Sequence, residues 1–283
     1  MSDYERRREI WGRLVLFVVA IPFFGLVTLI LPGRNHLALA IATTVATPFA
    51  SNEVLRLLLG DDRKSFAWLL AVISSALMPV LTYLEIIGVV GPHALLGFLA
   101  GVTCVLLVIS TVGSSSPSDE PIRRRISSSV LVLIYPGLLI SYVVRMGSLD
   151  HAGKVLLAFF IIVFGIDIAG YLSGRLTRSR PLGLAVSPNK TATGFIGSFL
   201  MGVILGFVST LLFPNALSLS PVAAIGIGAA MSIATMTGDL VESALKRAAA
   251  VKHSGRHIPG RGGLMDSIDS ILFAAPVFYA AIV

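Results

Sequence analysis

The stretch SALKRAAAVKHSGRHIPGRGGLMDSID, from Ser243 to Asp269, holds side chains that could do chemistry on phosphate groups. It contains seven basic residues, two aspartates and four glycines, although only 13% of the whole chain is charged. Lysine and arginine neutralise phosphate oxygens, and hard carboxylate oxygens bind Mg²⁺. Glycines let backbone N–H groups approach a phosphate closely. The stretch therefore predicts a site for a polyphosphate and its divalent metal, although it contains no P-loop motif.

Two carboxylates stand at the ends of this basic stretch, where one apolar run stops and the next begins. Asp239 and Asp266 would reach the same depth if the two runs are antiparallel neighbouring helices. We expect them to bind Mg²⁺ together, with a second cation left open, because one or two carboxylates plus substrate phosphates suffice for Mg²⁺. Simpler explanations exist for several of these charged residues. Glu242 and Lys246 could form an ordinary ion pair within a helix, and Asp266 and Asp269 could stand in a first helical turn because the helix dipole favours acids there.

A second polar segment, SGRLTRSRPLGLAVSPNKTATGFIGS, has a similar composition. Ser187, Lys190 and Thr191 are residue types that contact phosphates, and they precede a predicted helix whose N-terminus would favour an anion. A basic linker with glycines for close helix packing is an equally good interpretation. Upstream, Asp167 lies inside the apolar run FFIIVFGIDIAGYL, where an ionisable group is by default a functional candidate. Pairing with a nearby arginine, or a helix cap, is the alternative.

The rest of the chain has the composition of a membrane protein. Of its 283 residues, 55% are hydrophobic and the mean hydropathy is +0.88, whereas soluble domains have about 45–50% apolar residues. The apolar runs are long and lack period-two alternation, which favours helices over a barrel. The sequence predicts an all-α polytopic protein with about nine transmembrane helices, the first a retained span rather than a cleaved signal. The expected spans are 12–32, 36–58, 66–84, 92–113, 126–145, 154–173, 194–213, 217–238 and 264–283.

The basic residues predict the orientation. With nine spans, nineteen of the 22 lysines and arginines fall on one side, and Arg34, Arg145 and Lys154 fall on the other. Cytoplasmic loops carry such an excess of basic residues. We expect the N-terminus in the cytoplasm, the C-terminus outside and the protein in the cell inner (cytoplasmic) membrane. The excess positive charge itself is explained by topology and anionic headgroups, and no nucleic acid is expected as a partner.

Two halves of different character follow from this layout. We expect residues 1–150 to form an N-terminal transmembrane bundle with short loops, and residues 151–283 to form a catalytic transmembrane half with two cytoplasmic polar loops at 174–193 and 239–263. A secondary transporter is the alternative from another functional class. Transporters often show internal repeats and polar groups at the membrane midplane. Here no repeat is visible and the polar groups gather at one interface, which favours an enzyme.

The quoted stretches resemble the phosphatidate cytidylyltransferases, or CDP-diacylglycerol synthases. The resemblance covers roughly residues 160–283, and its matching positions in the last signature are Ser243, Lys246, Arg247, Lys252, Gly255, Ile258, Pro259, Gly262, Gly263, Asp266 and Asp269. DIAGYLSGR and SPNKTATGFIGS match upstream motifs of the family through Asp167, Gly170, Tyr171, Gly174, Ser187, Pro188, Lys190, Thr191, Gly194 and Gly197. The chain departs from the usual pattern at three positions, with His253 for Asp, Arg261 for His and Ser267 for Arg.

The resemblance implies an integral membrane enzyme that makes CDP-diacylglycerol and pyrophosphate from CTP and phosphatidate, with a divalent metal near Asp239 and Asp266. A divergent paralogue acting on another lipid phosphate is the nearest alternative, and a homodimer is left open. The residues expected to be catalytic are Asp239, Asp266, Lys246, Arg247 and Lys252. Those expected to bind substrate are Ser187, Lys190, Thr191, Arg261, Gly262, Gly263, Asp167 and Asp269. Asp269 would support the metal site, and Asp167 would orient groups on the lipid side or a further ion.

Overall fold

The computed structural model of the chain is all-helical over the residues that it describes, which are 28–29, 31–60, 66–112, 119–177, 179–251, 253–255 and 262–283. Its elements are α2 (Gly33–Leu59), α3 (Phe66–Ile86), α4 (Ala94–Val112), α5 (Asp119–Val132), the π-helix η2 (Leu133–Leu138), α6 (Leu139–Met146), α7 (Ala152–Leu176), α8 (Ala192–Leu212), α9 (Pro221–Ala248) and α10 (Met265–Ile282). The described residues form no strand, and Pro181 and Thr191 pair in an isolated antiparallel β-bridge. The predicted all-α class is therefore confirmed.

Seven of the described helices are long and apolar enough to cross a membrane. They are α3, α4, the continuous run Ile122–Met146, α7, α8, α9 and α10. The predicted span at 36–58 corresponds to α2, which is not among the seven because Asn52, Glu53 and Arg56 interrupt its apolar face. The predicted span at 12–32 lies almost entirely outside the described residues. A multi-pass membrane fold is thus confirmed, whereas the count of nine and the orientation stay predictions.

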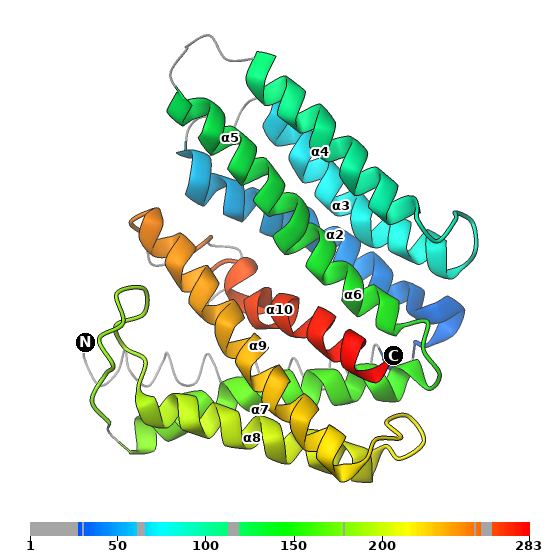
Figure 1. Cartoon of the computed structure of the whole chain (residues 1–283), viewed down its shortest axis with the longest axis vertical. Coiled ribbons are helices and arrows are strands. Elements are labelled where there is room, and N and C mark those ends of the chain that lie inside the picture. The colour runs from blue at the N-terminus through cyan, green and yellow to red at the C-terminus, as the bar shows by residue number, and fades with distance from the viewer. Residues whose placement is uncertain are drawn as a thin grey trace.

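The helices form two groups that meet at α10. Figure 1 shows α2 to α6 together at one side, α7 to α9 at the other, and α10 between α9 and α6. Large apolar side chains fill the junction, and the Phe159 and Phe278 rings of α7 and α10 pack with centroids 5.5 Å apart. Small residues bring α8 and α9 close, since a Cβ at Gly206 would lie only 2.8 Å from the Cα of Gly228. Membrane helices commonly associate through such small residues.

One transmembrane run contains a π-helical turn. Pro136 has no N–H to give to the helix, and the N–H of Leu139 bonds to the carbonyl of Ile134, five residues back. The turn η2 joins α5 to α6 and packs on α3. Such single π turns recur at functional positions. Here the turn carries Tyr135, whose side chain is directed to the interior and is 2% exposed.

The two polar loops are shorter than the sequence predicts. The prediction that residues 239–263 form a loop is wrong for its first part, because α9 continues to Ala248 and contains Lys246 and Arg247. The physical reason is that Glu242 and Lys246 form an i,i+4 ion pair, and Leu245 continues the apolar face of the helix. Similarly, α7 extends to Leu176, so the first polar connection runs from 177 to 191.

Candidate active site

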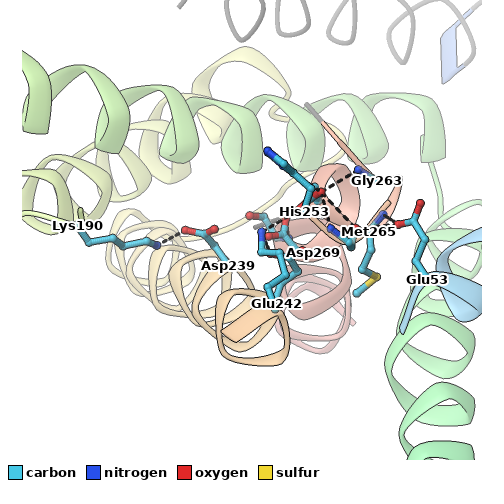
Figure 2. A network of polar contacts seen from close by, with 12 residues as sticks. Glu53, Lys190, Asp239, Glu242, His253, Gly263, Met265 and Asp269 are labelled. Carbon is cyan, nitrogen blue, oxygen red and sulfur yellow. Dashed lines mark hydrogen bonds and ion pairs between the residues drawn. The ribbon is translucent and has the colours of Figure 1, made fainter. Parts of the chain in front are cut away.

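The C-terminal half of α9 and the start of α10 touch through their backbones, and this contact organises the site. A Cβ at Gly238 would lie 2.5 Å from the carbonyl oxygen of Asp269. Its neighbour Asp239 therefore belongs to the part of α9 that packs on the first turns of α10. Figure 2 shows Asp239, Glu242 and Asp269 in succession, with Lys190 at one end and Glu53 at the other. The structure thus gathers at one end of the helices carboxylates that the sequence places on two separate runs.

Lys246 lies between two carboxylates. Its Nζ donates to Oδ1 of Asp266 over 2.6 Å and also forms an ion pair with Glu242 one turn earlier in α9. The Lys246 side chain is only 16% exposed, and those of both acids are buried. An ammonium group in such a place compensates charge that would otherwise be costly to bury. The helical pair of Glu242 and Lys246 is present, with Asp266 as a third member, and the predicted catalytic role of Lys246 stays a prediction.

The second oxygen of Asp266 is held by the polar connection that precedes α10. Oδ2 accepts hydrogen bonds from the N–H of Gly263 at 2.8 Å and from the N–H of Ser254 at 3.2 Å. Gly262 has φ +115°, and a side chain there would press against Asp266 and His253. His253 Nδ1 lies 4.0 Å from Oδ2. Gly262 and Gly263 let the backbone approach the carboxylate of Asp266 closely, and their predicted role in binding a phosphate stays a prediction.

Glu53 is a site residue that sequence reasoning does not identify. It is buried in α2 and accepts hydrogen bonds from the backbone N–H groups of Leu264 and Met265 at 2.9 and 2.8 Å. It also accepts from Oγ of Ser254 at 2.9 Å. The one sequence signal is an acid within an apolar run, since its partners lie more than 200 residues away.

Lys190 pairs with Asp239 across the site. The connection 177–191 folds back on itself, with a hydrogen bond of 2.7 Å from the N–H of Leu182 to the carbonyl of Lys190. This fold directs Lys190 to the carboxylate of Asp239, with which it forms an ion pair. Thr191 next to it is the N-cap of α8 and accepts the N–H of Gly194 at 3.1 Å. The structure therefore brings Lys190 to the acids and gives the Thr191 hydroxyl a capping role.

Asp167 and Tyr135 border the same acids from the interior. Oγ of Ser270 in α10 donates to Oδ1 of Asp167 in α7 at 3.3 Å, which links Asp167 to the residue following Asp269. The Tyr135 ring packs on Phe273 of α10, one turn after Asp269, with ring centroids 5.5 Å apart. Its hydroxyl is buried and has no hydrogen-bond partner in the part of the chain that the structure describes. Tyr135 is thus a further polar group at the site that the sequence analysis does not select.

Other predicted residues lie at the edge of the site or outside the described residues. Arg247 is exposed in the last turn of α9, and Ser187 is half-buried in the 177–191 connection. Lys252 and Arg261, with their neighbours Arg256 and His257, are outside the described residues. The roles predicted for these side chains stay predictions.

The donor set suits a hard divalent cation. Asp239, Glu242, Asp266 and Asp269 offer carboxylate oxygens, the ligands that Mg²⁺ prefers. Within the described residues, no three or more His, Cys, Asp or Glu side chains are arranged to hold one metal ion. Lysines stand beside the two predicted ligands, Lys190 at Asp239 and Lys246 at Asp266. The residues therefore fit a site in which two carboxylates, phosphate oxygens and water would hold the metal ion. Each of the two carboxylates already pairs with a lysine.

Comparison with known proteins gives a family match over nearly the whole chain. The family model described as the cytidylyltransferase family matches residues 11–283. This range includes both polar connections and all the carboxylates named above.

Individual relatives match about half of the chain. The phosphatidate cytidylyltransferase of Bacillus subtilis (strain 168) is 34% identical over 150 residues, which are 53% of this chain and 55% of the relative. That of Staphylococcus haemolyticus (strain JCSC1435) is 36% identical over 141 residues, 50% of this chain and 52% of the relative. The uncharacterized protein YnbB of Escherichia coli (strain K12) is 37% identical over 142 residues, 49% of this chain and 46% of the relative. The chain thus spans about half the length of the curated relatives it matches.

Proposed function

This chain belongs to the cytidylyltransferase family, and we propose that it transfers CMP from CTP to phosphatidate to give CDP-diacylglycerol and pyrophosphate. Two of the relatives above carry the name of this activity. Because each match covers only about half of this chain and half of the relative, the same activity for the whole protein is a proposal. Family membership disfavours the transporter alternative, and a different lipid phosphate as acceptor is the remaining competitor.

The observation that carries the proposal is the lysine between two buried acids. Lys246, Glu242 and Asp266 form a charged cluster at the polar end of helices that otherwise bury apolar side chains. A soluble nucleotide and a membrane-bound headgroup can meet only at such an interface. Lys190 adds a second cation from a separate connection. Lys246 in α9 and Lys190 in the 177–191 connection would thus contact a triphosphate from two sides.

The reaction needs positioning more than acid–base chemistry. A phosphate oxygen of phosphatidate forms a bond to the α-phosphorus of CTP, while the bond from that phosphorus to the bridging oxygen breaks and pyrophosphate leaves. The attacking oxygen is already an anion at neutral pH, so no strong general base is required. Holding the two phosphates in line and neutralising their charge supply most of the acceleration in phosphoryl transfer. Lys246, Lys190 and the predicted partners Arg247, Lys252 and Arg261 would provide that charge.

We assign Mg²⁺ to Asp239 and Asp266, with Asp269 behind them and a second cation left open. When bound, Mg²⁺ would supply positive charge that neutralises phosphate oxygens. Lys190 and Lys246, which pair with these acids, would add positive charge beside the phosphates of CTP. The donor chemistry and the lysine pairs support this assignment.

We further propose nine transmembrane helices, with the N-terminus and the polar connections in the cytoplasm and the C-terminus outside. The distribution of nineteen against three basic residues supports this orientation. In a bacterial cell this is the inner membrane, and association as a homodimer belongs to the same proposal. Residues 1–150 would then serve as the supporting bundle and 151–283 as the catalytic half.

The test is a reaction with purified protein in detergent or nanodiscs. CTP, phosphatidate and Mg²⁺ should yield pyrophosphate and CDP-diacylglycerol in equal amounts, and chelation of the metal should stop both. Parallel reactions with other lipid phosphates and with dCTP define the acceptor and the nucleotide. Release of no pyrophosphate with any lipid phosphate, at any Mg²⁺ or Mn²⁺ concentration, would refute the proposed activity.

A further inference from the structure

Glu53 is a buried acid in the half of the chain that carries none of the family signatures. Glu53 is 0% exposed, and the next two residues of the same helix, Val54 and Leu55, belong to the apolar core. An ionised carboxylate is costly in such surroundings unless it is strongly hydrogen-bonded, and acids in membrane proteins are by default functional candidates. The question is what this carboxylate holds.

Glu53 holds the start of α10. Its Oε1 accepts the N–H of Leu264 at 2.9 Å and its Oε2 accepts the N–H of Met265 at 2.8 Å. The first N–H groups of a helix have no partner within the helix, and their dipole favours an anion. Leu264 is the N-cap position of α10 and supplies no side-chain cap of its own. The carboxylate of α2 therefore caps a helix that follows it by more than 200 residues.

Ser254 connects this cap to the acid proposed for catalysis. Its Oγ lies 2.9 Å from Oε2 of Glu53 and 3.2 Å from Oδ2 of Asp266. The Ser254 N–H donates to Asp266 as well, at 3.2 Å. Glu53 and Asp266 thus hold the same turn from two sides, one through Leu264 and Met265 and the other through Gly263. A shift of Glu53 would move the turn and with it the carboxylate of Asp266.

The space around Glu53 gives independent support. A Cβ on Gly255 would overlap Oε1 of Glu53, and a Cβ on Gly263 would overlap Oε2. Both glycines belong to the last signature stretch, and neither has a positive φ that would itself require glycine. The carboxylate from α2 thus fills space that a side chain would need at both positions, together with Oγ of Ser254 and the backbone N of Gly255 at Gly263.

We propose that Glu53 is a positioning residue for the transfer reaction, fixing the N-terminus of α10 and, through Ser254, the carboxylate of Asp266. This inference rests on the proposed function for its kinetic part only. It also assigns the first half of the chain a direct part in the site.

The test compares Glu53→Gln with Glu85→Gln as a matched control. Glu85 is likewise an acid of the first half that caps a helix, with a side chain only 4% exposed; it accepts the N–H of Leu95 at 2.8 Å and pairs with Arg145 at 2.7 Å. Neither of these partners is a site residue named above. Glutamine keeps the size of glutamate but presents an amide NH₂ to one of the N–H donors. Both variants should lose some thermal stability, whereas only Glu53→Gln should change the site.

For Glu53→Gln we expect kcat to fall about tenfold or more and the Mg²⁺ concentration for half-maximal rate to rise, with KM for phosphatidate little changed. Glu85→Gln should keep the wild-type values per folded molecule. Rescue of part of the rate by Glu53→Asp, which keeps the charge, is also expected. If Glu53→Gln loses stability as Glu85→Gln does but keeps wild-type kcat and Mg²⁺ dependence, Glu53 is a structural cap only and the inference is overturned.

Hydrogen exchange separates this inference from the proposed function. Amide exchange in the peptide containing Leu264 and Met265 should accelerate in Glu53→Gln and stay slow in Glu85→Gln, whether or not the wild type turns over CTP. Unchanged exchange there would contradict the proposed contact. If Glu53→Gln fails to fold, Ser254→Ala replaces it, since it removes the hydroxyl that joins Glu53 to Asp266 and leaves both capping bonds and the bond from the Ser254 N–H to Asp266. That variant should raise the Mg²⁺ requirement, and wild-type Mg²⁺ dependence would overturn the inference.

Discussion

Gly238 of α9 packs directly on the backbone of Asp269 in α10. A Cβ at position 238 would lie 2.5 Å from the carbonyl oxygen and 3.1 Å from the carbonyl carbon of Asp269, and 3.2 Å from the Cα of Ser270. Backbone atoms cannot give way as the end of a flexible side chain can. The contact sets the separation of the two helices that carry Asp239 and Asp266.

The first prediction concerns this contact. Gly238→Ala should separate α9 from α10 and lower the transfer rate about tenfold or more, because small displacements of reacting groups are costly. Gly226→Ala is the control in the same helix, since a Cβ there meets nothing within 4 Å. It should keep the rate and leave thermal stability unchanged or higher, as alanine favours helix. Equal rates in the two variants would show that the close approach is not needed.

The second prediction concerns the acids. Asp239→Asn and Asp266→Asn keep the size of the side chain and remove its charge, so each should lower kcat by about 100-fold or more while the protein still inserts and folds. Asp150→Asn, at an exposed position between α6 and α7, should have no effect. Rates are measured across Mg²⁺ concentrations. Near wild-type turnover of either site variant at limiting Mg²⁺ argues against the two-carboxylate metal site.

The third prediction distinguishes two neighbouring cations. Lys246→Ala leaves Glu242 and Asp266 buried without their shared partner, so it should lower both kcat and the free energy of unfolding, the latter by about 3 kcal/mol. Arg247→Ala removes an exposed side chain and should raise KM for CTP without loss of stability. Lys154→Ala, exposed near the start of α7, serves as control. Loss of stability in Arg247→Ala, or none in Lys246→Ala, would contradict this division of roles.

The fourth prediction concerns orientation. A reporter inserted after Ala250 should be active in the cytoplasm, and one fused after Val283 should be active outside. The distribution of basic residues is the reason, because cytoplasmic loops retain lysine and arginine. Finding the 250 reporter outside the cell would refute both the topology and the place proposed for the reaction.

The sequence predicts the helices and part of the site well, for a physical reason. Apolar runs of sufficient length must be helical in a bilayer, so α3, α4, α7 and α8 agree with the expected spans within a few residues. The sequence also predicts that the end of one helix and the start of the next lie together, and α9 and α10 do pack on each other there, at Gly238 and Asp269.

The sequence-based prediction is less successful where contacts bridge distant segments. The density of charge places Lys246 in the predicted loop 239–263, although its helical ion pair with Glu242, given above only as the alternative, lets the helix continue. The pairing of Lys190 with Asp239 depends on the fold of the 177–191 connection, which no local pattern determines. Glu53 is missed because its role depends on partners over 200 residues away, whose approach only the packed structure reveals.

The cap that α2 provides for α10 also bears on how such a protein could be divided or recombined. Residues 151–283 carry every signature motif, yet the carboxylate that holds the first N–H groups of α10 lies on the other part of the chain. Residues 151–283 therefore depend on the first half of the chain for the start of α10. A chimera that joins them to a foreign bundle would preserve each signature residue and still leave α10 uncapped, unless an acid equivalent to Glu53 is transplanted with them.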